Sequence, residues 1–163
     1  MTRDPKNRQD LNGPDAKFLE TIDTYGWHVT KVVPNAGETG DVFAYTTGLF
    51  FRFRQPEIII FGLPLQTQHV ILNEIGRQMR DGVIFSPDRS YADIFANEVK
   101  CYFRSVQKRH YHAHVGWARW FYEGDDFPLL QCFWPDKQGF FPWEESCHPE
   151  IAKLQPQLFL PNP

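Results

Sequence analysis

The alternation of apolar and polar residues is clearest in the first half of the chain. It runs over Trp27–Val33 and again over Val42–Leu49, as expected for two half-buried strands. Between them, residues 34–41 (PNAGETGD) combine two glycines with proline, asparagine and aspartate, which predicts the loop of a hairpin. A continuous apolar run follows at Glu57–Phe61 and predicts a central strand covered on both faces.

Apolar residues at helical spacing recur in three other places. They predict a short amphipathic helix from Pro14 to Gly26, a long helix from Leu65 to Arg80 and a further helix from about His110 to Tyr122. Two more strands are predicted at 98–106 and 127–134, whereas residues 83–97 show no clear pattern.

Together these elements predict a single α+β domain. Its sheet is expected to be mixed or mainly antiparallel, with about five strands and two main helices on one face. The 163 residues suffice for one domain with a substantial core. We expect residues 1–13 to be a mobile lead-in, residues 14–150 to form the domain, and residues 151–163, which contain three prolines, to be an extended arm on the surface.

Composition narrows the possible partners. With 17 basic and 20 acidic residues, the net charge of −3 offers no basic excess for nucleic acid. The polar N-terminus and the lack of a long apolar run predict no association with a membrane. Three cysteines without CxxC spacing argue against a disulfide framework and a structural zinc site, so a reducing compartment, the cytoplasm, is expected.

Three histidines alternate at His110, His112 and His114. On a strand their imidazoles would share one face and suit a transition metal. On a helix the same spacing scatters them, and only the first and third stay together. The helical pattern of the surrounding residues favours the second alternative, and we expect neither a metal nor another cofactor.

Candidate catalytic groups surround the predicted junction of the central strand and the long helix. His69 lies in the first turns of that helix and is a candidate general base or proton shuttle, with Glu57 or Asp136 as the carboxylate that orients it. Tyr45 offers a hydroxyl group. The alternative is that His69 only packs at the edge of the helix's buried face.

Candidate binding residues are of two kinds. Thr46 and Gly48 lie together in a predicted strand, where a glycine indicates a bulge or the close approach of another backbone or a ligand. Trp134 and Trp143, each next to a proline, belong to an aromatic segment that either forms a lid or caps an open end of the core.

Several blocks in fixed order resemble a known family. They are YGW (25–27), FAYTTGL (43–49), PE with an apolar strand and GLP (56–64), TQH (67–69) and LLQCFWPDKQGFFPWE (129–144). This order is similar to the bacterial domain of unknown function family 4262, over about residues 18–144. The positions that match include Tyr45, Gly48, Glu57, His69, Trp134, Asp136, Gly139 and Trp143. The resemblance implies no established activity.

A weaker similarity, over residues 43–64, is to suppressor-of-fused-like domains, some of whose bacterial members look like immunity or interaction proteins. The leading hypothesis is therefore a cytoplasmic, non-catalytic binding protein of immunity or accessory type, whose protein partner meets the aromatic surface from Trp134 to Trp143. The competing hypothesis is a small hydrolase-like or proton-transferring enzyme that uses His69 with Glu57 or Asp136 and a hydroxyl from Tyr45 or Thr46.

Overall fold

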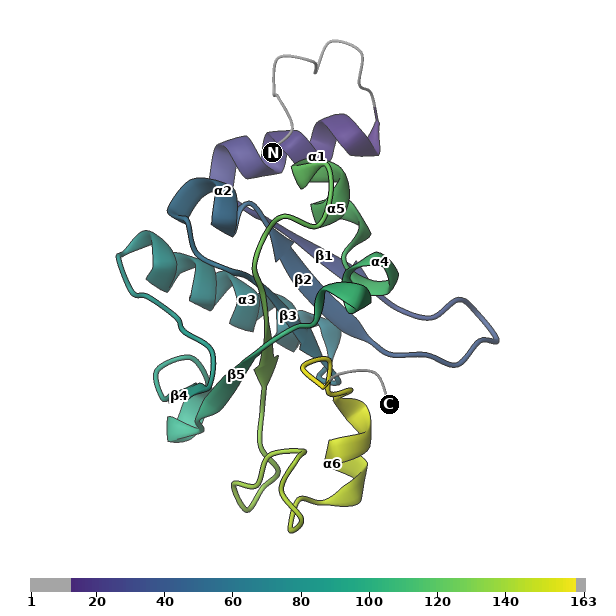
Figure 1. The fold of residues 1–163 in the computed structure, drawn as a ribbon, viewed down its shortest axis with the longest axis vertical. Coiled ribbons are helices and arrows are strands. Elements are labelled where there is room, and N and C mark those ends of the chain that lie inside the picture. Colours follow the sequence, from purple (N-terminus) through teal and green to yellow (C-terminus); the bar gives the residue numbers. More distant parts are fainter. Residues whose placement is uncertain (1–12, 161–163) are drawn as a thin grey trace.

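The computed structural model describes residues 13–160 and contains a mixed sheet of six strands (Figure 1). In spatial order the strands are β1 (His28–Val32), β2 (Phe43–Thr47), β3 (Glu57–Phe61), β6 (Leu129–Phe133), β5 (Cys101–Ser105) and β4 (Arg89–Tyr91). Strands β3 and β6 are parallel, and all other neighbours are antiparallel. The predicted hairpin is confirmed as β1 and β2, and β3 is confirmed as a central strand.

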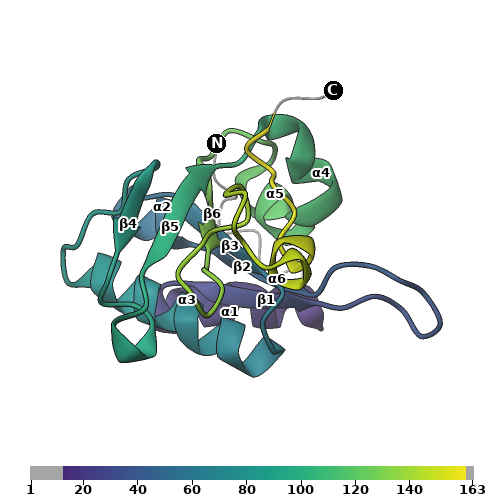
Figure 2. The ribbon, with the colours of Figure 1, turned by 90° about the horizontal axis from the view of Figure 1, so that it is seen from below.

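The main helices lie on both sides of this sheet. They are α1 (Pro14–Tyr25), α3 (Leu65–Arg80), α4 (Tyr111–His114), α5 (Gly116–Tyr122) and α6 (Pro149–Leu154). Figure 2 shows α3 on one side of the sheet and α4 and α5 on the other. The short α2 (Leu49–Phe53) and two single 3₁₀ turns, η2 (Ala96–Glu98) and η3 (Lys108–His110), complete the described chain.

Two hydrophobic cores explain why helices cover both faces. Ile59 and Phe61 of β3 pack into a core with α1, α4 and α5, whereas Ile58 and Ile60 pack into a second core with α3. All four side chains have no exposed surface. The expectation of helices on one face was therefore wrong, because a strand that is apolar on both sides needs cover on both sides.

Three further elements differ from the sequence-based expectation. The sheet has a sixth strand, β4, in the segment without a clear pattern. The predicted strand over Val42–Leu49 ends at Thr47, and the chain turns at Gly48 into α2. The helix expected from His110 to Tyr122 is divided at Val115, whose φ of −118° and ψ of 51° are not helical.

The predicted extended C-terminal arm begins instead with α6. His148 caps this helix by accepting a hydrogen bond from the Glu150 N–H, and Pro149 occupies the first turn, where a missing N–H has no cost. Beyond it, two glutamines attach the chain to the sheet. The Gln131 amide donates to the carbonyl oxygen of Pro156 and accepts the Leu158 N–H. The Gln155 amide accepts the Trp134 N–H and donates to the Trp134 carbonyl oxygen. The lead-in expected at residues 1–13 lies, except for Gly13, outside the described residues.

Candidate functional site

The Glu57 carboxylate is the most heavily hydrogen-bonded acidic group of the structure. It has no exposed surface and accepts backbone N–H groups from Gly48, Leu49 and Phe50 at 2.9, 3.2 and 3.2 Å. Those N–H groups belong to the start of α2, whose own cap residue, a glycine, has no side chain to satisfy them. Glu57 therefore joins the first residue of β3 to the turn that ends β2.

Two hydroxyl groups complete this arrangement, which we call the Glu57 hub. Thr46 Oγ1 donates to Glu57 Oε1 at 2.8 Å and accepts the Ile58 N–H at 2.9 Å. Tyr122, at the end of α5, donates its hydroxyl proton to Glu57 Oε2 and accepts the Phe51 N–H at 3.1 Å. Each hydroxyl thus acts as both donor and acceptor, and the two connect the carboxylate to backbone N–H groups of β3 and α2.

Burial raises the pKa of the Glu57 carboxyl above its ordinary value, and the hydrogen bonds from Tyr122, Thr46 and the backbone act in the opposite direction. Burial and the neighbouring Glu57 raise the pKa of the Tyr122 hydroxyl as well. A group so enclosed exchanges protons only if the surrounding structure opens. The chemistry of Glu57 is therefore that of a structural support.

Gly48 shows why the turn beside Glu57 requires glycine. Its φ is 120°, and a Cβ atom placed there would lie 2.6 Å from the carbonyl oxygen of Gly26 and 2.9 Å from the Cα atom of Trp27. The close approach predicted for Gly48 is confirmed, and the approaching group is the backbone that connects α1 to β1.

His69 lies apart from this hub. It belongs to α3, on the Ile58 and Ile60 face of the sheet, whereas Glu57 bonds Tyr122 of α5, which packs into the core of the opposite face. Burial, and secondarily Lys31, lower the pKa of the His69 imidazole. Within residues 13–160, no hydrogen bond joins His69 to Glu57 or to Asp136.

Tyr45 is 2% exposed and packs with α5, where its hydroxyl oxygen accepts the Trp117 N–H at 3.0 Å. Burial raises its pKa. The structure therefore does not bring together the set predicted for an enzyme: Tyr45 and Glu57 belong to one face of the sheet, His69 to the other, and Asp136 to the loop after β6.

The predicted aromatic surface is largely internal. Trp134 is 7% exposed and donates its indole N–H to the carbonyl oxygen of Phe61 at 2.7 Å. Trp143 is half-buried: it stacks on Phe141 with ring centroids 5.3 Å apart, and the Arg104 guanidinium lies 5.0 Å from its centroid. Of the two alternatives for this segment, the structure shows rings that cap the core.

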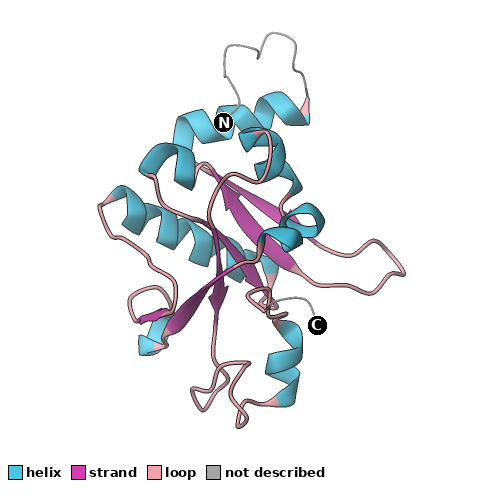
Figure 3. Cartoon of the chain, in the orientation of Figure 1, coloured by secondary structure: helices cyan, strands magenta, loops and turns pink. Residues whose placement is uncertain are grey.

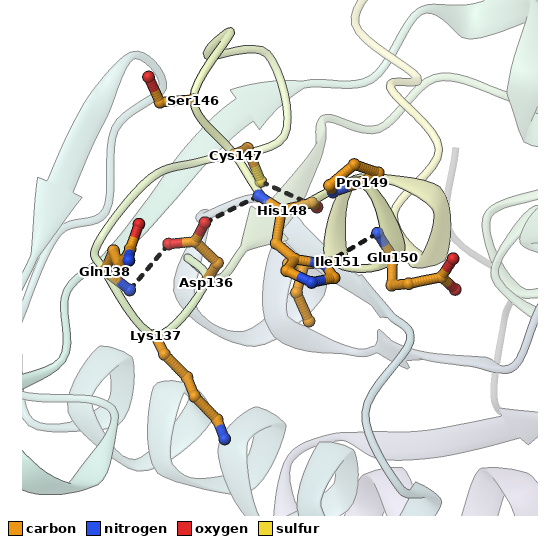
Figure 4. Close-up of a pocket in the computed structure, with 9 residues that line it drawn as sticks. All are labelled: Asp136, Lys137, Gln138, Ser146, Cys147, His148, Pro149, Glu150 and Ile151. Carbon is orange, nitrogen blue, oxygen red and sulfur yellow. Dashed lines mark hydrogen bonds between the residues drawn. The ribbon is translucent and has the colours of Figure 1, made fainter.

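Asp136 organises the loop that follows β6, most of which is neither helix nor strand (Figure 3). Its Oδ1 accepts the N–H group of Gln138 at 2.9 Å and its Oδ2 accepts that of His148 at 2.8 Å (Figure 4). Its Oδ1 also accepts the N–H group of Phe140 at 2.9 Å. These bonds, that from Phe140 first, lower the pKa of the Asp136 carboxyl. Asp136 therefore locks the segment Pro135–Phe141, which we call the ridge, onto the start of α6.

A hollow lies on each side of the ridge. The larger, which we call the Asp136 cleft, has a volume of about 610 Å³ and is lined by Asp136, Lys137, Gln138, Ser146, Cys147, His148, Pro149, Glu150 and Ile151 (Figure 4). The other has a volume of about 490 Å³ and is lined by Glu98, Val99, Lys100, Pro135, Asp136, Lys137, Gly139 and Phe141. The exposed Lys137 lines both hollows, whereas Gln138, also exposed, lines only the Asp136 cleft.

No activated nucleophile faces the Asp136 cleft. Burial, with Asp136 and Glu144, raises the pKa of the Cys147 thiol, which disfavours the reactive thiolate. The thiol donates to the carbonyl oxygen of His148 at 3.6 Å, and the His148 ring is occupied as the cap of α6. The Cys147 thiol and the His148 ring are therefore both engaged in hydrogen bonds within the wall of the cleft.

Of the three alternating histidines, the first and third stay together, as the helical alternative predicted: the ring centroids of His110 and His114 lie 6.2 Å apart. His114 packs its ring on Phe43 and Phe61, while His112 lies beside the Arg119 guanidinium. In the part of the chain that the structure describes, no three histidine, cysteine, aspartate or glutamate side chains lie so that they could hold a metal ion. The three cysteines are free thiols.

The fold and these hollows define an α+β domain with a buried carboxylate that links β2, β3 and α5 and with two hollows beside the ridge. No described helix is both long and apolar enough to cross a membrane. The chain belongs to the family described as domain of unknown function (DUF4262), whose profile matches residues 21–148. Comparison with curated proteins and with solved structures found no match.

Two groups of residues at these sites were not predicted from the sequence. The Asp136 cleft is lined by Cys147, His148 and Ile151 because α6 folds back beside the ridge. No local sequence pattern predicts this tertiary arrangement. A third hollow, apart from the two beside the ridge, contains Asn73, Arg77 and Arg80 together with His69. For these four there was a signal, because successive positions three or four apart share one face of a helix.

Proposed function

We propose that this protein is a non-catalytic binding protein and that a protein partner docks on the ridge Pro135–Phe141 and its two hollows. The observation that carries the proposal is the Asp136 carboxylate, which fixes an exposed loop through three backbone hydrogen bonds. A loop held in one conformation before binding loses less entropy when a partner docks. The surface is therefore preorganised for recognition.

The hollows supply the complementary shape. Val99 is 37% exposed beside one of them, and the side chains of Pro149 and Ile151 offer apolar surface in the other. Lys137 and Glu150 place charges of opposite sign near the same opening. Apolar recesses bordered by a few charged groups are typical of protein interfaces. A cytoplasmic role of immunity or accessory type, as expected from the sequence, is part of this proposal.

Site-specific photo-crosslinking tests the proposal. A photoreactive amino acid in place of Gln138 leaves the backbone bond to Asp136 intact and is expected to capture one defined partner from the native host. The matched control carries the same amino acid in place of Glu20, which is exposed on α1 and lines none of the hollows described above. Adding Lys137→Glu is expected to abolish the adduct at Gln138.

Equal adducts from both positions, or none from Gln138, would contradict docking on the ridge. So would a partner whose capture is unaffected by Lys137→Glu.

A further inference from the structure

A groove separate from the ridge lies where α1, β1 and α3 meet. We call it the His69 groove; it has a volume of about 470 Å³ and is lined by Thr21, Tyr25, Trp27, Val29, His69, Asn73, Arg77 and Arg80. It shares no lining residue with either hollow beside the ridge. The groove is therefore a site separate from the proposed docking surface.

The lining carries positive charge and no carboxylate. Arg77 and Arg80 border the groove, and their nearest carboxylate partners, Glu74 at 3.0 Å and Asp81 at 3.6 Å, lie outside its lining. Both ion pairs are solvent-exposed and therefore weak, so an anion in the groove can compete for the guanidinium groups. Guanidinium forks match the geometry of phosphate and carboxylate oxygens.

Two more polar groups, on Asn73 and His69, make no hydrogen bond to the described residues through one of their atoms. The Trp27 indole N–H donates to Asn73 Oδ1 at 2.9 Å, and because an indole only donates, the Asn73 amide is oriented with its NH₂ group unused by residues 13–160. Nδ1 of His69 is buried and has no hydrogen-bond partner among the described residues. Asn73 is half-buried and lines the groove, so its NH₂ group is accessible to a ligand there.

We propose that the His69 groove binds a small organic molecule through an oxyanion, a phosphate or carboxylate group held by Arg77, Arg80 and the Asn73 amide. Trp27 and Val29 form the apolar floor beneath the rest of the molecule. Tyr25, which is 71% exposed, stands at the rim with its ring and hydroxyl group available to the ligand. The volume accommodates a molecule of metabolite size.

Titration followed by NMR tests this site, with the Trp27 indole N–H resonance as reporter. Inorganic phosphate, adenosine monophosphate and citrate are the anionic probes, and uncharged adenosine is the control ligand. Saturable shifts with the phosphate compounds alone identify a phosphate site, and shifts with citrate alone identify a carboxylate site. Arg77→Ala/Arg80→Ala is expected to weaken the binding by about tenfold or more.

The matched variant is Arg89→Ala/Lys153→Ala, which removes the same charge at exposed positions that line neither the groove nor the hollows beside the ridge, and it is expected to bind normally. Asn73→Ser is a second, smaller test and is expected to weaken binding without loss of either arginine. The proposal is overturned if no anion shifts the Trp27 resonance, if adenosine shifts it as adenosine monophosphate does, or if the two double variants weaken binding equally.

Discussion

Two carboxylates of this protein, Glu57 and Asp136, each accept three backbone N–H groups, yet their pKa values move in opposite directions. Glu57 has no exposed surface, and burial raises its pKa. Asp136 is 9% exposed and borders the Asp136 cleft, and the hydrogen bonds lower its pKa. The comparison shows that similar hydrogen bonding leads to opposite titration behaviour when the solvent environment differs.

The two groups also differ in the range of chain that they connect. Glu57 bonds the turn at Gly48 and also Tyr122, which lies 65 residues after Glu57 in the sequence. It so connects β2, β3 and α5. Asp136 bonds residues no more than 12 positions away. We therefore expect changes in the Glu57 hub to affect global stability and changes at Asp136 to affect mainly one loop.

The largest effect is expected from Glu57→Gln. An amide nitrogen in place of Oε1 would face the Leu49 N–H, and in place of Oε2 the N–H groups of Gly48 and Phe50, so either orientation sets donor against donor. We expect a loss of about 3–5 kcal/mol in the free energy of unfolding, measured with urea. Glu74→Gln, at an exposed ion pair, is the control and should cost less than about 1 kcal/mol.

The raised pKa of Glu57 also fixes the sign of the pH dependence of stability when wild type is compared with Glu57→Gln. Because the folded-state pKa of Glu57 is raised, the native protein holds more protons than the unfolded chain between the ordinary value of about 4.3 and the folded value. The stability of wild type relative to Glu57→Gln should therefore fall as pH rises through this window. A relative stability that rises with pH would contradict the assigned direction.

Gly48→Ala is expected to have the next largest effect. The added Cβ would lie within 3 Å of two backbone atoms that no side-chain rotation can move, at a φ of 120° that alanine rarely adopts. We expect a loss of about 2–4 kcal/mol, measured by urea unfolding. Gly82→Ala is a control with a φ of 99° and no atom within 4 Å of the added Cβ, and it should show the cost of the conformation alone.

The hub also shows how far the sequence could be interpreted. The strand at Glu57, the close approach at Gly48 and the extent of α3 followed from local patterns. The role of Tyr122 did not, because hydrogen bonding across 65 residues depends on how α5 packs and leaves no local signal. The strand expected up to Leu49 was too long because LFFRF is apolar enough for a strand, whereas the positive φ at Gly48 and the carboxylate of Glu57 start a helix there.

The region around Asp136 was predicted less completely. Its turn chemistry was visible in the sequence, but the proline-containing tail indicated an extended arm and concealed α6. A local signal was present, since His148, Pro149 and Glu150 supply a cap, a favoured first residue and an acid in the first turn. The burial of Trp134 depends on the distant carbonyl of Phe61 and could not be inferred from its own segment.

Tyr122→Phe is expected to have a smaller effect than either change above. It keeps the ring packed on Phe127 but removes the proton donated to Glu57 and the oxygen that accepts the Phe51 N–H. We expect a loss of about 1–3 kcal/mol by urea unfolding. Tyr111→Phe, which removes a single bond to the Phe127 carbonyl, is the control and should cost less. Equal losses would show that α5 is not held specifically through the hub.

Asp136→Asn is expected to have the smallest effect on global stability and the clearest local one. Its amide nitrogen would replace one acceptor, either for Gln138 and Phe140 or for His148, so hydrogen exchange should accelerate at the N–H groups that lose their acceptor while β3 stays protected. In wild type the lowered pKa of Asp136 stabilises the loop above the ordinary value of about 3.9, and this contribution is lost as pH falls through the folded value. In wild type, the protection of these N–H groups against hydrogen exchange should therefore disappear in acid. In Asp136→Asn, their protection should not depend on pH in this way. If the variant instead unfolded globally like Glu57→Gln, the ridge would be part of the central fold and the contrast between the two carboxylates would fail.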